Sequence, residues 1–298
     1  MIVIAKQIVV VSGKGGTGKT VVTGSFAVLD DFKIIVDCDV DAANLHLLLN
    51  SKIHERHIFK SGVSPRLDEA LCNGCGSCFG VCHFGALGKV SKEGKVVPSF
   101  DPMACQGCGL CAHVCPAKAI EMVENIAGEW FLSSTKYGPF YHARLKAAAE
   151  NSGKLVARIK KEAMKLATLM KTPHLLVDGP PGIGCPVIAS LSGARLAVVV
   201  TEPTISGIHD VERIIGLAKT FRIPVKVIIN KYDLAPEKTG AIEAFCQQRG
   251  IEVLGRIPFS PLVVEAVIRG IPVVEYDQGE IAASIKSIWQ KVIAYCDK

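Results

Sequence analysis

Apolar residues occur in short continuous runs, separated by polar or helix-like segments, over most of the chain. A run without alternation is typical of a strand buried on both faces of a parallel sheet. Segments between the runs carry apolar residues at helical spacing, as in GIHDVERIIGLAKTF and TGAIEAFCQQRG. Strands that alternate with helices predict an α/β fold with a doubly wound, mainly parallel sheet. The runs that we interpret as strands are QIVVVSG, KIIVDCD, HLLVDG, RLAVVVTE, VKVIIN and IEVLGRIP.

Residues 61–122 interrupt this pattern. They contain eight of the twelve cysteines, together with many glycines and prolines. We therefore predict an α/β domain formed discontinuously by residues 1–60 and 123–298. Residues 61–122 are then a smaller α+β domain inserted after the second strand. The length of 298 residues suits this division, because it allows one large domain or two smaller ones.

Composition and charge narrow the class of protein. No stretch approaches the ~18 uninterrupted apolar residues of a membrane helix, so we expect no stable membrane insertion. The net charge of +6 is mild and does not by itself indicate nucleic-acid binding. The opening residues MIVIAKQIVVVSGKGG fit a strand better than a cleaved signal, and we expect a cytoplasmic protein. Cytosolic thiols stay reduced, so clustered cysteines indicate metal ligands rather than disulfides.

A glycine-rich loop, SGKGGTGKT, follows the first apolar run and fits the phosphate-loop pattern G-x-x-x-x-G-K-[ST]. Its glycines let backbone N–H groups turn toward an anion, and the start of the next helix adds a favourable dipole. In such a loop Lys19 contacts the β- and γ-phosphates, and the Thr20 hydroxyl holds Mg²⁺. The predicted nucleotide-binding residues of the loop are Gly13, Lys14, Gly15, Gly16, Thr17, Gly18, Lys19 and Thr20.

The loop carries a second lysine, Lys14, and KGGTGKT resembles the deviant Walker A loop of the MinD/ParA family. That family includes the nitrogenase iron protein and the Mrp-type cluster carriers. The resemblance implies an ATPase that forms a nucleotide-dependent homodimer, or a heterodimer with a close paralogue. It implies that Lys14 reaches the phosphates held by the other subunit, which places a cation on the transition state only in the dimer.

Two further segments resemble the nucleotide switches of this family. VDCDVDAANLHLLL is similar to switch I, which implies that Asp37 supports Mg²⁺ and that Asp39 positions the attacking water. Asp41 is better explained as a cap of the next helix. The implied catalytic residues are thus Lys14, Lys19 and Asp39. LLVDGPPGIG is similar to switch II, where Asp178 closes an apolar strand and reaches Mg²⁺. The switch II residues are Asp178, Gly179, Pro180, Pro181 and Gly182, and the magnesium residues are Thr20, Asp37 and Asp178.

The nucleotide base leaves an alternative open. VIINKYD and GRIPFSP resemble the base-binding segments of the family, which implies that Asn230 and Pro258 flank the adenine of ATP. Asn230, Lys231 and Asp233 also fit the N-K-x-D pattern that is typical of GTPases. The residues alone permit ATP or GTP, and the resemblance favours ATP with Mg²⁺.

The cysteines of the inserted segment form two matching rows, CNGCGSCFGVCH from Cys72 and CQGCGLCAHVCP from Cys105. Both follow C-x₂-C-x₂-C-x₃-C, the ligand run of two-cluster bacterial ferredoxins, in which the fourth cysteine binds the other cluster. A zinc site more often uses two separated pairs. We predict one [4Fe–4S] cluster at Cys72, Cys75, Cys78 and Cys115, and a second at Cys82, Cys105, Cys108 and Cys111. Residues 61–122 therefore resemble a dicluster ferredoxin, and the whole chain resembles MinD-superfamily ATPases that carry such an insertion.

Three functions stay open on this basis. Eight encapsulating thiolates favour ATP-gated electron transfer to a partner metalloprotein. The likeness to Mrp-type proteins favours assembly or delivery of iron–sulfur or other metallocofactors. A spatial-positioning ATPase with redox-sensing clusters is the third, and the weak membrane and nucleic-acid signals count against it. In each of the first two cases we expect a redox or metallocofactor protein as the partner.

Two weaker signals complete the sequence. Cys185 lies seven positions after Asp178 and could ligate a bridging cluster in a dimer, although a small packed residue is the simpler interpretation. Residues 141–171 contain eight Lys or Arg against two Glu, with apolar residues at helical spacing. They predict a helix whose basic face is either solvated or docks an acidic partner.

Overall fold

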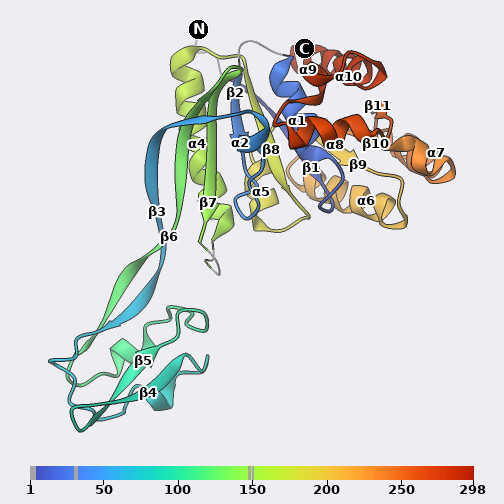
Figure 1. The fold of residues 1–298 in the computed structure, drawn as a ribbon. Coiled ribbons are helices and arrows are strands. Elements are labelled where there is room, and N and C mark those ends of the chain that lie inside the picture. Colours follow the sequence, from blue (N-terminus) through green and yellow to red (C-terminus); the bar gives the residue numbers. More distant parts are fainter. Residues whose placement is uncertain (1–4, 30–32, 147–148, 150) are drawn as a thin grey trace. The chain divides into compact units, whose positions relative to one another are not determined.

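The computed structural model describes residues 5–29, 33–146, 149 and 151–298, and the chain divides into two compact units (Figure 1). The first unit comprises Met1–His57, Glu129–Leu145 and Ser152–Lys298, and the second comprises Ile58–Gly128 and Lys146–Asn151. The domain boundaries proposed from the sequence, at 61 and 122, stay a prediction. Two of the four crossings between the units fall inside the long strands β3 and β6, and the other two follow Leu145 and Asn151.

The first unit is built on a sheet with the strand order β11-β10-β9-β1-β8-β2-β7-β6-β3. The pairs from β11 to β7 are parallel, which confirms the predicted mainly parallel α/β sheet. Strands β6 and β7 form a hairpin that turns at Lys136 and Tyr137. The strand bounds are β1 Lys6–Ser12, β2 Lys33–Asp37, β3 Lys52–Leu67, β6 Ile120–Thr135, β7 Gly138–Leu145, β8 His174–Pro181, β9 Leu196–Thr201, β10 Val225–Asn230 and β11 Val253–Ile257.

Helices cover this sheet because its central strands are apolar on both faces. On β1, Ile8 and Val10 join a core with Phe26 and Trp289, whose rings lie 4.7 Å apart. Val9, which is also fully buried, points to the opposite face, since side chains alternate along a strand. The helix bounds are α1 Lys19–Val28, α2 Leu45–Leu48, α4 Ser152–Met170, α5 Cys185–Leu191, α6 Ile205–Thr220, α7 Pro236–Gln248, α8 Pro261–Ile268, α9 Val273–Tyr276 and α10 Glu280–Cys296, with a 3₁₀ turn η2 at Tyr232–Leu234.

The parallel strands place their carboxyl ends at one edge of the sheet. Ligands of open α/β sheets bind at this edge. The residues that end or directly follow these strands include Ser12, Asp37, Thr201, Glu202 and Asn230, whereas β8 continues past Asp178 to Pro181. The candidate site is therefore assembled from strand ends that are distant in the sequence.

The second unit contains a small antiparallel sheet of β4 Leu87–Lys92 and β5 Lys95–Phe100, joined at Glu93 and Gly94. Both turn residues have positive φ, 50° and 78°, as a tight two-residue hairpin requires. A 3₁₀ turn, η1 Phe79–Val81, and a short helix, α3 Leu110–His113, lie within the two rows of cysteines, each before the fourth cysteine of its row.

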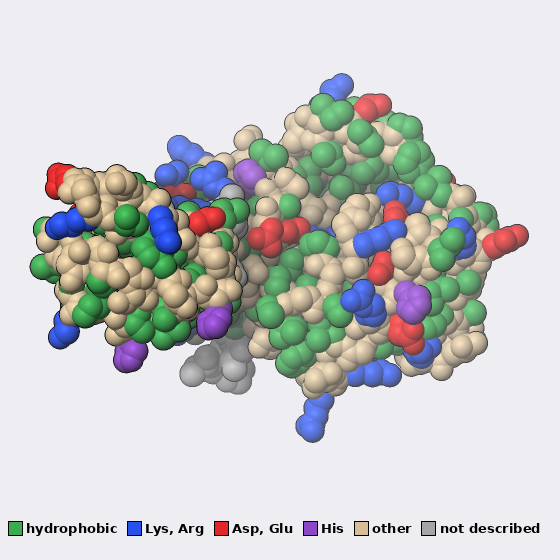
Figure 2. All heavy atoms as spheres, turned by 90° about the horizontal axis from the view of Figure 1, so that it is seen from below, with side chains coloured by type: hydrophobic (Ala, Val, Ile, Leu, Met, Phe, Trp, Pro, Cys, Tyr) green, Lys and Arg blue, Asp and Glu red, His purple; other side chains and the backbone are tan. Residues whose placement is uncertain are grey.

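The surface carries no large patch of one charge on the face drawn in Figure 2. Basic and acidic side chains are interspersed there, which fits the mild net charge of +6. Among the described residues, no helix is both long and apolar enough to cross a membrane.

His142 gives the first unit a defined pH dependence. It is buried on β7 between Phe131 and Phe140, with ring centroids 4.9 and 4.8 Å away, and it faces the ring of His46 at 5.7 Å. Burial, aided by His46, lowers the pKa of His142 to about 4. The unfolded chain binds a proton near pH 6.5 and the folded chain does not, so stability is full above pH 6.5 and is lost toward pH 4. We expect this group to remove roughly 3 kcal/mol of unfolding free energy across that window, since each pKa unit is worth ~1.4 kcal/mol.

The test compares wild type with His142→Phe, which keeps an aromatic ring in the stack. Urea unfolding at several pH values between 4 and 7 should show a flatter pH profile for the variant. If the variant loses as much unfolding free energy between pH 7 and pH 4 as wild type does, other groups cause the acid sensitivity.

Candidate functional site

The glycine-rich loop connects β1 to α1, and a side chain at the end of β10 holds its backbone in place. Gly18 caps α1 with φ 87°, and a Cβ there would overlap the amide of Asn230, so only glycine fits. The Nδ2 of Asn230 donates to the Thr17 carbonyl at 2.8 Å. The predicted loop residues Gly13, Lys14, Gly15, Gly16, Thr17 and Gly18 all lie in this connection.

A buried ion pair forms the centre of the site. The Nζ of Lys19 lies 2.9 Å from Oδ1 of Asp178, and the two side chains are only 6% and 1% exposed. The Thr20 hydroxyl donates to Oδ2 of Asp178 at 2.8 Å, and the Thr23 hydroxyl donates to Oδ1 at 2.7 Å. Burial by itself would lower the pKa of Lys19, but the charges of Asp178 and Asp37 raise it. Lys19 is therefore held as a cation.

Asp37 lies beside this pair at the end of β2, in register with Asp178 on β8. It is fully buried, and its oxygens accept the N–H groups of Asp39 at 3.0 Å and Leu45 at 3.3 Å. Burial, together with the neighbouring Asp178, raises the pKa of Asp37 to about 8. Burial also raises the pKa of Asp39.

These oxygens suit a divalent cation. Two carboxylates, Asp37 and Asp178, repel each other at close quarters, and a hydroxyl, Thr20, contacts one of them. Hard oxygen ligands of this kind are the ones that Mg²⁺ prefers, and the cation would relieve the repulsion. The hydroxyl of Thr17 is buried without a hydrogen-bond partner among the described residues, at the turn of the glycine-rich loop. The donor set thus fits a phosphate with its Mg²⁺.

The segment predicted as switch II lies close to the base of the loop. The N–H of Gly182 donates to the Ser12 carbonyl at 2.8 Å. A Cβ at Gly179 would lie 2.7 Å from Val11, so this glycine lets β8 approach β1. Pro180 and Pro181 complete β8 between these two glycines.

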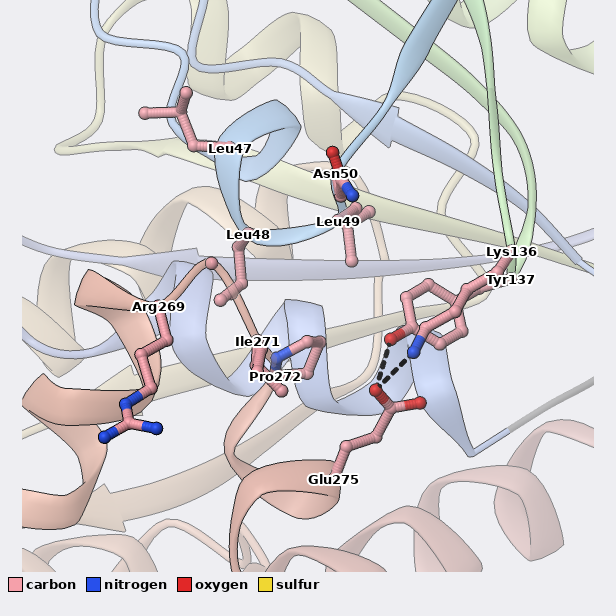
Figure 3. Close-up of a pocket in the computed structure, with 11 residues that line it drawn as sticks. Leu47, Leu48, Leu49, Asn50, Lys136, Tyr137, Arg269, Ile271, Pro272 and Glu275 are labelled. Atoms are coloured by element: carbon pink, nitrogen blue, oxygen red, sulfur yellow. Dashed lines mark hydrogen bonds and ion pairs between the residues drawn. The ribbon is translucent and has the colours of Figure 1, made fainter.

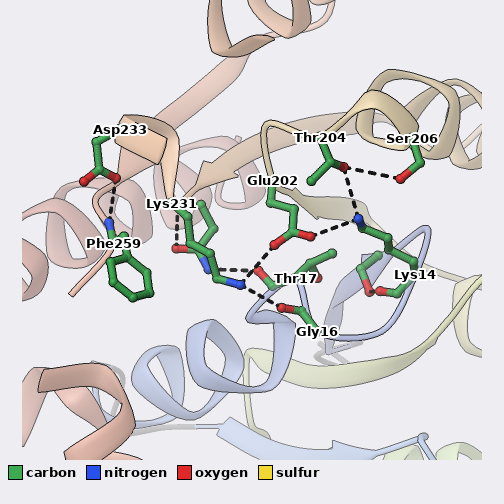
Figure 4. A network of polar contacts seen from close by, with 11 residues as sticks. Lys14, Gly16, Thr17, Glu202, Thr204, Ser206, Lys231, Asp233 and Phe259 are labelled. Carbon is green, nitrogen blue, oxygen red and sulfur yellow. Dashed lines mark hydrogen bonds and ion pairs between the residues drawn. The ribbon is translucent and has the colours of Figure 1, made fainter. Parts of the chain in front are cut away.

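The second lysine of the loop is held by a residue that the sequence analysis missed. The Nζ of Lys14 lies 2.9 Å from Oε1 of Glu202 and donates to the Thr204 hydroxyl at 3.0 Å (Figure 4). The other oxygen of Glu202 lies 3.0 Å from the Nζ of Lys231, which donates to the Gly16 carbonyl at 3.1 Å. Burial works against ionisation of Glu202, but the two lysines lower its pKa. The position of Glu202 directly after the apolar run RLAVVVT was the available signal.

The two predicted base-binding segments meet at the same edge. Asn230 ends β10, and Pro258 directly follows β11. Oδ1 of Asp233 accepts the N–H of Phe259 at 2.7 Å, which links the two segments (Figure 4).

The eight cysteines of the second unit form two groups of four, each with its fourth member from the other row. Cys72, Cys75, Cys78 and Cys115 line one pocket, together with Leu67, Val96, Pro98 and Ile120. Cys82, Cys105, Cys108 and Cys111 line another, together with Phe84, Leu87, Phe100 and Met122. Among the described residues, no three His, Cys, Asp or Glu side chains converge as they would around a single metal ion. The eight thiols surround two apolar pockets instead.

The two rows repeat the same backbone. The N–H groups of Cys72 and Cys105 donate to the carbonyls of Asp68 and Asp101 at 3.2 and 3.0 Å. Matching glycines at the second and fourth positions after each first cysteine have positive φ: Gly74, Gly76, Gly107 and Gly109. Successive N–H groups in such turns form concave sites for anions, including iron–sulfur clusters. The chemistry of both donor sets therefore fits a four-iron cluster.

The remaining cysteines and the basic segment are placed differently. Cys185 begins α5 and is exposed, whereas Cys38, Cys246 and Cys296 are buried. The prediction of a helix over residues 141–171 is correct only for Ser152–Met170, which form α4, since residues 141–145 belong to β7. Lys160 of α4 does not lie on a solvated face. Its ammonium is buried and donates to the carbonyls of Ala189, Ser190 and Ser192 at the C-terminal end of α5.

A separate pocket of about 420 Å³ lies away from the glycine-rich loop (Figure 3). Tyr137 and Lys136 from the β6–β7 turn both bond one oxygen of Glu275, at 2.8 and 2.6 Å. Burial is the main cause that raises the pKa of Tyr137 to about 12. None of the residues predicted to bind nucleotide lines this pocket.

A glycine-rich loop between the first strand and helix, with a buried lysine and two aspartates paired across adjacent strands, defines a phosphate-loop nucleotide-binding α/β protein. The CobQ/CobB/MinD/ParA nucleotide binding domain matches residues 8–273. The chain belongs to this family.

Relatives and solved structures agree with this assignment. The uncharacterized protein MJ0578 of Methanocaldococcus jannaschii is 34% identical over 76% of this chain and 79% of its own length. The iron-sulfur cluster carrier protein of Pyrococcus horikoshii is 24% identical over 47% of this chain and 52% of its own. The septum site-determining protein MinD of Pyrococcus horikoshii, solved with Mg-ADP, shares the fold with a TM-score of 0.58 at 19% identity, over 97% of this chain and 96% of that one.

The ion pair at the centre of the site predicts a non-additive loss of stability. In Asp178→Asn alone, Asp37 stays as a counterion for Lys19, and the reverse holds for Asp37→Asn. The double variant leaves the buried ammonium with Asp39 as its only neighbouring carboxylate, and loss of both closer partners typically costs roughly 3–5 kcal/mol. Urea unfolding without nucleotide or Mg²⁺ should therefore show a larger loss for the double variant than the sum of the single losses. Additive losses would mean that the two carboxylates do not share Lys19.

Proposed function

We propose that this protein is an ATP-hydrolysing iron–sulfur protein that couples a MinD-type nucleotide switch to two [4Fe–4S] clusters, which stay bound and pass electrons to a partner metalloprotein. The observation that carries the proposal is the grouping of the eight thiols, in which each set of four takes its last member from the other row. A site whose ligands come from two segments of one chain suits a cluster that stays permanently bound.

The residues of the first unit divide the work on ATP and Mg²⁺. Loop N–H groups and Lys19 bind the β- and γ-phosphates, while Thr20, Asp37 and Asp178 hold Mg²⁺ directly or through its waters. Asp39 orients a water whose oxygen bonds to the γ-phosphorus as the bond to the β–γ bridging oxygen breaks. The products are ADP and inorganic phosphate. Asn230 and the segment at Pro258 flank the adenine.

Lys14 makes hydrolysis depend on a second subunit. Within one chain its ammonium is occupied by Glu202 and Thr204. In a nucleotide-dependent homodimer it would leave these partners and neutralise charge on the phosphates of the other subunit. Lys14 then has two alternative positions, one on Glu202 in the single chain and one on the phosphates of the other subunit, and bound ATP favours the second.

The second unit would hold the clusters with its own thiolates. Cys72, Cys75, Cys78 and Cys115 form the first set, and Cys82, Cys105, Cys108 and Cys111 form the second. When bound, the clusters supply one-electron chemistry. The chain itself supplies the link, because the switch I segment, from Val36 to Leu49, leads within a few residues into β3, which ends at Leu67 beside the first set.

Delivery of clusters to other proteins is the second candidate, and the likeness to iron-sulfur cluster carrier proteins favours it. One experiment separates the two. Cluster-loaded protein is mixed anaerobically with Mg-ATP and an excess of an apo iron–sulfur acceptor, and iron and released phosphate are counted. We expect about eight irons to stay on this chain through many turnovers.

Lys14→Ala provides the internal comparison in this assay. It should still bind ATP but release phosphate about 10²-fold more slowly, because it lacks the cation that the dimer supplies. Lys161→Ala, at an exposed position on α4, should behave as wild type. If iron leaves this chain only when ATP is present, the proposal of electron transfer is wrong and cluster delivery is the function.

The thiol grouping predicts which substitutions act on the same cluster. Cys72→Ala and Cys115→Ala lie in different rows, yet both should remove the same reduced-state EPR signal and about half of the iron. Cys82→Ala, at the position equivalent to Cys115, should remove the other signal. If Cys115→Ala instead matched Cys105→Ala, each row would bind its own cluster and the proposed sets would be wrong.

A further inference from the structure

The two cysteine sites match in backbone but differ in the polar groups that reach the sulfurs. We call the set with Cys72 the first site and the set with Cys105 the second site. Position by position, Ser77 in the first row corresponds to Leu110 in the second. Each lies between the second left-handed glycine and the third cysteine of its row.

Hydrogen-bond donors contact two sulfurs of the first site. The hydroxyl of Ser77 lies 3.4 Å from Sγ of Cys75. The N–H of Ala119 donates to Sγ of Cys115 at 3.3 Å. A positive charge is also near, because the ammonium of Lys95 donates to the Cys72 carbonyl at 3.5 Å.

The second site is lined by apolar and aromatic groups at the corresponding places. Leu110 has no donor, and the rings of Phe84 and Phe100 line the pocket with Met122. Within the described part of the chain, the backbone N–H of Ala112 bonds the sulfur of Cys111, but no side-chain donor contacts a thiol of this site. The two sites therefore differ in polarity although their loops have the same shape.

Solvent exposure differs between the sites at one position, the third of each row, where Cys78 is buried and Cys111 is half-buried. Cys75 and Cys108, at equivalent positions, are both exposed, and Cys72 and Cys105 are both half-buried. Ser77 and Leu110 are also both exposed. The side chain that differs in its ability to donate a hydrogen bond to a sulfur is therefore the one at Ser77 and Leu110.

Adding an electron to an iron–sulfur cluster makes it more negative. Hydrogen bonds to the sulfurs and a nearby cation stabilise that added charge and raise the reduction potential. Resting on the proposed binding of two clusters, we propose that the first site holds the more easily reduced cluster and that Ser77 is a residue that sets this order. A chain that carries one electron then holds it at the first site.

The test exchanges the two side chains at the equivalent positions. Ser77→Leu and Leu110→Ser are made singly and together, with Ser77→Ala as a smaller change that removes the hydroxyl without added bulk. Both midpoint potentials are measured on the full chain by EPR-monitored titration with dithionite.

Wild type should give two separate potentials. Ser77→Leu and Ser77→Ala should each lower the upper potential and leave the lower one in place. Leu110→Ser should raise the lower potential, and the double exchange should narrow or reverse the separation. The inference is overturned if the Ser77 variants shift the lower midpoint potential, or if they leave both midpoint potentials unchanged.

Iron content is counted first in every sample. Fewer than about eight irons in wild type would contradict the proposed binding of two clusters and not the order of their potentials. With both clusters present, the titration alone decides the order.

Discussion

The buried pair of Lys19 and Asp178 is the interaction on which the nucleotide end of the sheet depends. One charge comes from the start of α1 and the other from within β8, and the two charged atoms lie 2.9 Å apart on side chains that are almost fully buried. Charges this deep are tolerated only when they are paired and hydrogen-bonded. The pairing therefore requires that β1 and β8 lie side by side, and Gly179 permits it by leaving no side chain between them. Asp37 adds a second carboxylate, so the corner carries groups for a phosphate and for a cation at once.

Near that pair, Glu202 binds the ammonium groups of two lysines and so fixes their positions. It holds Lys14 and Lys231, and Lys231 in turn holds the Gly16 carbonyl. The pair with Lys14 is partly exposed, with the lysine side chain at 34%, and partly exposed pairs are worth about 1 kcal/mol or less. Such a contact orders the loop within one chain but is weak enough to be exchanged for a phosphate. The proposed movement of Lys14 to a second subunit thus meets no large barrier from this contact.

Sequence reasoning succeeded where a local pattern has one physical explanation. Strands such as β1 are apolar at every position because both faces are covered, and the glycine-rich loop is recognisable because Gly18 admits no side chain. It failed where a role depends on contacts distant in the chain. Glu202 and Lys160 look like ordinary surface residues, and only the fold brings one to Lys14 and the other to the carbonyls after α5. The long strand β3 was also missed, because KIHERHIFKSGVSPRL is largely exposed and has no continuous apolar run.

Both units have a backbone arrangement that suits a strongly negative ligand. A nucleotide triphosphate and an iron–sulfur cluster are each strongly negative, yet the whole chain carries a charge of only +6. In each unit, glycines with positive φ turn successive N–H groups toward the place where the negative charge would sit: Gly16 and Gly18 in one, Gly74, Gly76, Gly107 and Gly109 in the other. Side chains then adjust a backbone site that already exists. Lys19 adds full charge for phosphates, whereas Ser77 adds only a dipole. A dipole suits a cluster that must gain and lose an electron, because it shifts the balance between two charge states without fixing one of them.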